Sequence, residues 1–217
     1  MSSDEKNNSL IILWKNKFSE RGFRNEFLIV ISILIISLIS LSNFLLFNEL
    51  REGEVVADPV LNLFSPVNVT WLTFLIIYAG LIIAVIYLIK FPEQLSLAFL
   101  TYSITALMRL IAMYTLPLNP PVNIIPLNDP FVQLFGTGNI LLKDLFFSGH
   151  TSTLFILYLI IENKKLKTFF LLLTISVAVC VLIQHVHYTV DVLAAPFFTY
   201  GSFILAKKLL ISIRKIL

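Results

Sequence analysis

The chain has three histidines, and two of them stand in short polar motifs whose spacing suits acid–base or nucleophilic chemistry. One motif, HYTVD at residues 187–191, places His187 four residues before Asp191. If the segment is helical, the two side chains share one face, and the carboxylate can hold one ring N–H and make the other nitrogen more basic. The pair therefore predicts either a histidine activated as a base or nucleophile, or an aspartate that caps a helix beside a histidine at the membrane interface.

The other motif, FSGHT at residues 147–151, combines a histidine with groups that can hold an anion. Gly149 allows close approach of the backbone, and Ser148 is a good helix N-cap. The free amides of the first helical turn would then point outward beside His150, together with the hydroxyl of Thr151, and such a turn is a ready site for phosphate. The alternative is an ordinary N-cap with a histidine that reaches the interface.

The composition indicates whether these motifs belong to a soluble protein or to a membrane protein. Of the 217 residues, 58% are apolar and 13% are charged, with a mean hydropathy of +0.90. These values argue against a soluble globule and against a disordered chain. The net charge of +3 gives no reason to expect a nucleic-acid partner, and the single cysteine, Cys180, cannot form an intramolecular disulfide. The sequence thus predicts an integral membrane protein surrounded by a lipid bilayer.

Six stretches are long and apolar enough to cross a bilayer core, which takes ~20 residues of helix. They are residues 27–47, 69–89, 95–116, 145–161, 168–186 and 190–206. The apolar runs are continuous rather than alternating, so helices and not a barrel are expected. The predicted fold class is an all-α, polytopic membrane protein built as a six-transmembrane-helix bundle.

The basic residues predict the orientation of this bundle. Thirteen of the sixteen Lys and Arg residues fall before the first span, after the sixth, or in the loops on that same side. By the positive-inside tendency both termini are cytoplasmic. The predicted parts are an N-terminal interfacial segment at 1–26, a membrane catalytic domain at 27–206 and a basic cytoplasmic tail at 207–217. A solvated leader is the alternative for the first of these parts.

This topology brings the two motifs together at the non-cytoplasmic face. The fourth and sixth spans start there and the fifth ends there, so His150, His187 and Asp191 are expected at similar depth. Ionisable residues in or near spans cost several kcal/mol unless they are solvated or paired, and they mark functional sites. The third histidine, His185, is interpreted as a supporting or interfacial residue.

Two charged residues near this face have open roles. Arg109 lies inside the third span, ~10 Å from its outer end. It can bind a substrate phosphate, or it can form a structural pair with Asp191 or Asp144. Asp144 in turn can bind an amine headgroup or form a solvated pair with Lys143 at the interface.

The two motifs resemble those of the type 2 phosphatidic acid phosphatase superfamily of lipid phosphatases and phosphotransferases. The longer words DLFFSGHT at 144–151 and HYTVDV at 187–192 are more similar to its sphingomyelin-synthase-like branch. The resemblance spans about residues 95–200 and implies that His187 attacks phosphorus, that Asp191 supports it and that His150 protonates the leaving group. The residues expected to bind substrate or phosphate are Ser148, Gly149, Thr151, Arg109, Asp144 and Tyr188.

The sequence departs from the phosphatases of that superfamily at one point. They carry an arginine some residues before the nucleophilic histidine, whereas residues 180–186 contain none. A phosphate monoester approaches two negative charges and benefits from a cationic clamp, while a phosphodiester carries one. The sequence therefore favours transfer of a phospho-headgroup from a phospholipid donor to a lipid or water acceptor through a phosphohistidine. No metal or cofactor is required, since Arg109, helix amides and hydroxyls can meet the charge on phosphorus.

Three other functions compete with this interpretation. A lipid phosphate phosphatase, with water as acceptor, carries the same motifs. A metal enzyme would need His185 and His187 on one ion, but residues i and i+2 of a helix point to nearly opposite faces. A transporter or other non-enzymatic membrane protein would carry polar groups through the middle of the bilayer, whereas here they gather at one face. The sequence does not indicate an oligomeric state.

Overall fold

The computed structural model describes residues 3–127 and 141–217, with side chains from residue 9 onward. Within these ranges the regular structure is helical, apart from an isolated bridge between Glu54 and Leu118. The helices are α1 (Ser3–Ser19), α2 (Arg21–Glu49), the 3-10 turn η1 (Leu61–Leu63), α3 (Thr70–Leu88), α4 (Pro92–Thr115), α6 (Gly149–Ile160), α7 (Lys164–Ile183) and α8 (Thr189–Ile216).

Five of these helices, α2, α3, α4, α7 and α8, are long and apolar enough to cross a membrane. They agree with the predicted all-α, multi-pass membrane protein. The fourth predicted span, residues 145–161, is shorter than expected, because α6 has only 12 residues and a length of about 18 Å. Its side-chain caps explain the bounds: Ser148 caps its first turn, and Asn163 already caps the first turn of α7.

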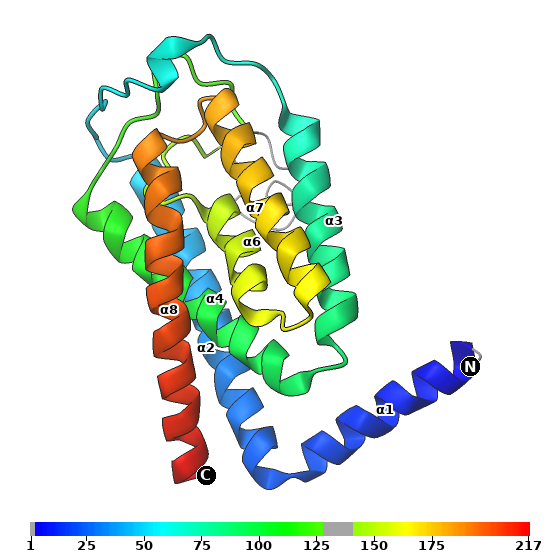
Figure 1. Ribbon diagram of the computed structural model, residues 1–217. Helices are drawn as coiled ribbons and strands as arrows, with labels where there is room; N and C mark the ends of the chain where they lie inside the picture. Colours follow the sequence, from blue (N-terminus) through cyan, green and yellow to red (C-terminus); the bar gives the residue numbers. More distant parts are fainter. Residues whose placement is uncertain (1–2, 128–140) are drawn as a thin grey trace.

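Helix α4 crosses the bundle and packs against α2, α6 and α8, while α6 is flanked by α7 and α8 and α3 packs on α7 (Figure 1). The buried face of α4 is rich in small hydroxyl residues that bond back to their own helix, such as Thr101, Ser103 and Thr105. Small side chains let helix backbones approach closely where lipid supplies no hydrophobic driving force. The close packing of α4 thus follows from its sequence.

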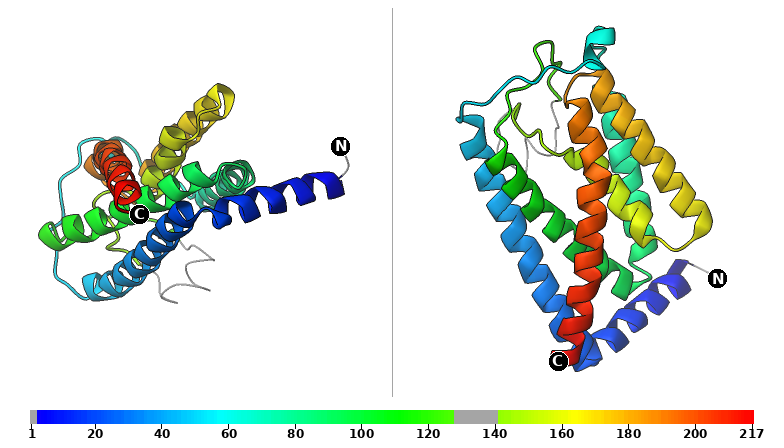
Figure 2. Two further views of the ribbon diagram at one scale, coloured as in Figure 1. Left: turned by 90° about the horizontal axis from the view of Figure 1, so that it is seen from below. Right: turned by 60° about the vertical axis from the view of Figure 1, so that its left-hand side comes forward.

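Both termini lie at one end of the bundle, and the residues 50–69 and the α7–α8 turn lie at the other (Figures 1 and 2). At the end with the termini, α1 is held by two polar contacts. Trp14 Nε1 donates to the carbonyl of Ile89 at 2.9 Å, and Lys17 Nζ lies 3.0 Å from Glu93 Oε1. The predicted interfacial segment is therefore a helix tied to the α3–α4 turn.

A buried carboxylate joins three long helices at the same end. Glu26 of α2 is 1% exposed, accepts a hydrogen bond from Ser96 Oγ at 2.9 Å, and lies 2.5 Å from Arg214 Nε of α8. Helix α2 thus begins before residue 27, and α8 continues as helix through most of the predicted tail at 207–217.

Candidate functional site

The first turn of α6 lies below the outer ends of its neighbours. In both side views α6 starts well beneath the upper end of α7 (Figures 1 and 2). The non-helical residues that lead to it are buried, with Leu145 at 2%, Phe147 at 0% and Ser148 at 0% exposure. Irregular backbone at membrane depth is tolerated where protein covers it, so this segment can deliver a helix N-terminus into the bundle.

The side chain of Ser148 caps α6, as its position in the motif predicts. Its Oγ accepts from the backbone N–H of Thr151 at 3.4 Å and from Thr151 Oγ1 at 3.1 Å. Ser152 Oγ donates to the carbonyl of Ser148 at 2.7 Å. The first turn is therefore fixed by its own hydroxyls, with His150 in its second position.

His187 does not lie on a helix. Helix α7 ends at Ile183 and α8 begins at Thr189, so His187 belongs to the turn and precedes the N-cap residue Tyr188. Asp191 Oδ2 accepts from the backbone N–H of Tyr188 at 3.0 Å and lies 3.5 Å from His187 Nδ1. The spacing left open whether Asp191 supports the histidine or caps a helix. Its carboxylate does both, because it caps α8 and also faces the imidazole of His187. His187 is 1% and Asp191 0% exposed.

The two motifs meet in space. The ring centroids of His150 and His187 are 6.3 Å apart, with 67° between the ring planes. The backbone N–H of Ser148 donates to the carbonyl of Asp191 at 3.1 Å, which ties the start of α6 to the first turn of α8. A group of the size of a phosphate can contact both imidazoles in such an arrangement.

Arg109 reaches this region from α4. Its Nε donates to the carbonyl of Phe147 at 2.8 Å, and its Nη2 pairs with Asp144 Oδ1. A Cβ added to Gly149 would lie 2.6 Å from Nη1 of Arg109, so the glycine is what admits the guanidinium beside α6. Of the two carboxylates considered for Arg109, Asp144 is the one that it contacts. Of the two roles left open for Asp144, the pair with Lys143 is not formed, because Lys143 Nζ donates to the carbonyl of Arg51.

Tyr188 lies between the outer loops. Its hydroxyl accepts from the backbone N–H of Val56 at 3.2 Å and donates to the carbonyl of Asn119 at 2.9 Å. Loop backbone therefore takes both hydrogen-bonding roles of this hydroxyl, and the residue positions the turn that carries His187.

Asp58, in the acidic loop between α2 and α3, is a functional candidate that lies outside the two histidine motifs. The residue is only 9% exposed, and its carboxylate accepts from Thr189 N at 2.6 Å and Thr189 Oγ1 at 3.0 Å, at the start of α8. Burial raises the pKa of this carboxyl, but the hydrogen bonds from Thr189, Leu61 and Val60 outweigh it and hold the pKa below its usual value. No periodicity marks such a loop residue, since its partner lies 131 positions away.

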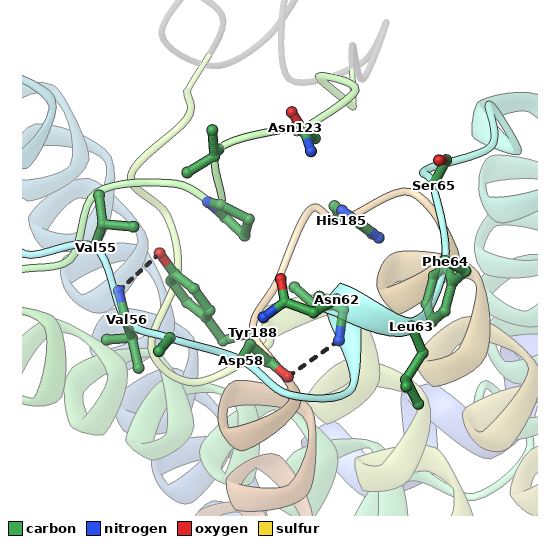
Figure 3. A pocket seen from close by; sticks show the side chains of 14 residues that line it. Val55, Val56, Asp58, Asn62, Leu63, Phe64, Ser65, Asn123, His185 and Tyr188 are labelled. Carbon is green, nitrogen blue, oxygen red and sulfur yellow. Dashed lines mark hydrogen bonds between the residues drawn. The ribbon is translucent and has the colours of Figure 1, made fainter.

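A cavity of about 580 Å³, the outer pocket, opens beside this loop, and Figure 3 shows Asp58, Asn62, His185 and Tyr188 around it. His185 has a backbone φ of 56° and packs edge-on against Phe64, with 5.1 Å between ring centroids. Burial lowers the pKa of His185, and the carboxylate of Asp58 opposes the shift. The neutral imidazole is therefore favoured, and the side chain lines the outer pocket.

Comparison with known proteins connects these motifs to a family. Residues 143–208 match the model of the PAP2 superfamily C-terminal domain. The chain carries this domain. The match includes both histidine motifs and covers α6, α7 and most of α8. The resemblance recognised from the motifs is thereby confirmed.

Two curated relatives are similar over the same length of chain. The phosphatidylcholine:ceramide cholinephosphotransferase 2 of Macaca fascicularis is 40% identical over 68 residues, and that of Homo sapiens is 38% identical over 68 residues. Each alignment covers 29% of this chain and 19% of the relative, so the chain matches about a fifth of the length of these proteins. No solved structure matches the chain. Arg109 and Asp58 precede the PAP2 C-terminal domain and are added to the site by α4 and by the first outer loop.

Proposed function

We propose that the chain is an integral membrane lipid phosphotransferase that moves a phospho-headgroup between lipids, with a lipid hydroxyl or water as acceptor. The observation that carries the proposal is the cluster of His150, His187 and Asp191 at the starts of α6 and α8. The PAP2 C-terminal domain supports it, and so do two relatives named as phosphatidylcholine:ceramide cholinephosphotransferases. A phospholipid donor and a sphingoid or glycerolipid acceptor are therefore the first substrates to examine.

The proposed reaction has two steps. Asp191 faces Nδ1 of His187, which leaves Nε2 of that ring to attack phosphorus. A P–N bond forms and the P–O bond to the donor lipid breaks, while His150 gives a proton to the departing alkoxide. His150 then takes the proton of the acceptor hydroxyl, whose oxygen attacks the phosphohistidine, restores His187 and releases the product.

In this proposal, Arg109 and the backbone N–H groups in the first turn of α6 stabilise the negative charge on the phosphoryl group. Asp144 and the carbonyl of Phe147 hold two nitrogens of the guanidinium, and Nη1 lies nearest to Gly149. A donor fixed in place before the reaction stabilises developing negative charge without reorganisation. In this proposal Ser148 and Thr151 shape the same turn.

The proposed topology has six crossings, with the short α6 as one of them, both termini in the cytoplasm and the site on the opposite face. It is supported by the position of the termini at the end away from the outer pocket (Figure 1) and by the basic residues near that end. Within this topology, residues 1–26 form the interfacial segment, 27–206 the membrane catalytic domain and 207–217 the basic cytoplasmic tail.

The test is turnover by the purified chain in vesicles that contain labelled phosphatidylcholine, with and without ceramide or diacylglycerol. His187→Ala is expected to abolish turnover because it removes the nucleophile. His150→Ala is expected to abolish it because it removes the acid–base assist, which is worth about 10²–10⁴ in rate. His185→Asn is the matched control. Asparagine tolerates the positive φ of this position, and position 185 lies outside the cluster formed by the other two histidines and Asp191. Release of phosphocholine alone would identify hydrolysis of the phosphodiester, with water as acceptor, and full activity of either alanine variant would refute the assignment.

A further inference from the structure

One face of α4 changes from apolar to polar along its length. Leu95, Ala98, Phe99 and Tyr102 stand at positions i, i+3, i+4 and i+7, and the same side of the helix continues to Arg109. The residues from Leu95 to Arg109 span fourteen positions, about 21 Å of helix. That distance exceeds half of the ~30 Å hydrocarbon core of a bilayer.

Helix α6 has a matching face that runs the opposite way. Gly149 and Ser152 stand at its polar end, and Thr153, Ile156 and Leu157 follow. Because α4 and α6 pack together, the two graded faces line one continuous path. The path begins among aliphatic side chains and ends at the guanidinium beside the histidine pair.

Two cavities lie along this path. The first, the lateral groove, has a volume of about 330 Å³ and an almost wholly apolar lining from α2, α3, α4 and α6. The second is a small cavity of about 40 Å³ lined by Arg109 and Gly149. Both are lined by Tyr102, Thr153 and Ile156, so the two cavities are neighbours along the path.

The lateral groove faces the side of the bundle that lipid contacts. Val85 of α3 is 58% exposed and Leu38 of α2 is 42% exposed, and both line it. Helix α2 packs mainly on α4 and α3 mainly on α7, which leaves the groove between them. A volume of this size is in the range of ligand pockets, ~300–1,000 Å³.

We propose that the lateral groove binds one acyl chain of the substrate lipid and directs its polar end toward Arg109, an inference that rests on the proposed function. An acyl chain in a bilayer is the apolar ligand always present at this depth. A phospholipid has the same gradient as the path, with hydrocarbon at one end and an anionic phosphodiester at the other. Tyr102 and Thr153 mark the level at which the tail meets the polar linkage.

A second apolar groove lies between α4 and α8 and has a similar volume of about 390 Å³, but it does not adjoin the small cavity at Arg109. Its lining includes Met108, Phe197 and Gly201 and shares no residue with the cavity of Arg109 and Gly149. It provides a matched control for substitutions that fill a groove.

The experiment is labelling by a phosphatidylcholine that carries a diazirine in its acyl chain, added to vesicles containing the full chain. Wild-type protein is expected to be labelled on α3, α4 and α6. Ala98→Phe, which fills the lateral groove, should lower that labelling at least tenfold, the factor that corresponds to about 1.4 kcal/mol. Displacing two methylenes of the tail suffices for this loss. Gly201→Phe in the α4–α8 groove should leave it unchanged.

Labelling needs no turnover, which separates this proposal from the proposed function. His187→Ala should be labelled like the wild type, and a chain that is labelled in the groove but never transfers a headgroup would refute only the function. If Ala98→Phe fails to fold, Val85→Trp blocks the groove from a membrane-exposed position. Equal labelling of wild type and either filled variant, or label confined to α8, would overturn the acyl-chain assignment.

Discussion

At the scale of single residues, the absence of a side chain at Gly149 makes room for the guanidinium of Arg109 at the first turn of α6. A Cβ there would come within 2.6 Å of Nη1 and 2.8 Å of Cζ of the guanidinium, distances that require Arg109 to move. Gly149→Ala is therefore expected to lower kcat about 10–100-fold, because a shift of about 1 Å in a catalytic group can cost 10²-fold. The measurement is headgroup transfer in vesicles at saturating donor lipid.

The matched control for this prediction is Gly201→Ala. An added Cβ at Gly201 meets no atom within 4 Å, so the variant should keep wild-type transfer and stability. Full transfer by Gly149→Ala would mean that Arg109 does not stabilise the phosphoryl group from its observed position.

Residue types and spacing predicted the pairing of His187 with Asp191 but not its cause. The spacing of four suggested one helical face, whereas the contact forms because Asp191 caps α8 and the preceding turn brings His187 back to the carboxylate. The partner of Arg109 was left open because Asp144 lies 35 positions away in a loop. Local motifs thus carry information on caps and turns, while contacts across the chain depend on packing.

At the scale of elements, the first outer loop and α8 are coupled through Asp58. Its carboxylate accepts from Thr189 and also holds η1 through the backbone N–H of Leu61. Since its pKa is lowered in the folded chain, the carboxylate contributes stability above its unfolded pKa of ~3.9, and this contribution is lost as the pH falls through the folded value. Asp58→Asn should therefore lower the apparent melting temperature at pH 7, and by less at pH 3, which lies below the unfolded pKa.

Thermal unfolding in detergent at both pH values measures this coupling. Glu52→Gln is a suitable control, because it removes an exposed carboxylate from the same loop. Equal losses of melting temperature for Asp58→Asn at both pH values would contradict a stabilising role of the carboxylate charge.

The helices themselves were largely predictable, and their ends were not. Hydropathy located five long spans because their apolar runs exceed the thickness of a bilayer core. It overestimated the fourth, since residues 145–148 are apolar enough to count as span yet run as buried loop until Ser148 caps α6. It also placed Glu26 outside the first span, although Ser96 and Arg214 satisfy that carboxylate inside the bundle.

At the scale of the whole molecule, the two ends of the bundle carry different groups of polar residues. The end with both termini carries α1 and the pairing of Glu26 with Arg214, and the other carries the capped starts of α6 and α8 below the outer pocket. Lipid headgroups occupy both interfaces, but the histidine pair lies near one of them. The orientation of the chain therefore decides which leaflet supplies the substrate.

Cysteine labelling tests this orientation and the number of crossings together. Val122, 83% exposed near the outer pocket, is expected outside, while Lys208 near the end of α8 and Lys164 after α6 are expected in the cytoplasm. In a Cys180→Ser background, a membrane-impermeant maleimide should label Val122→Cys on intact cells, and it should label the other two variants only after permeabilisation. Labelling of Lys164→Cys from outside would contradict the crossing assigned to α6, because the α6–α7 connection lies at the end of the bundle opposite the α7–α8 turn (Figure 1). Labelling of Lys208→Cys from outside would instead invert the bundle and assign the histidine pair to the cytoplasmic leaflet.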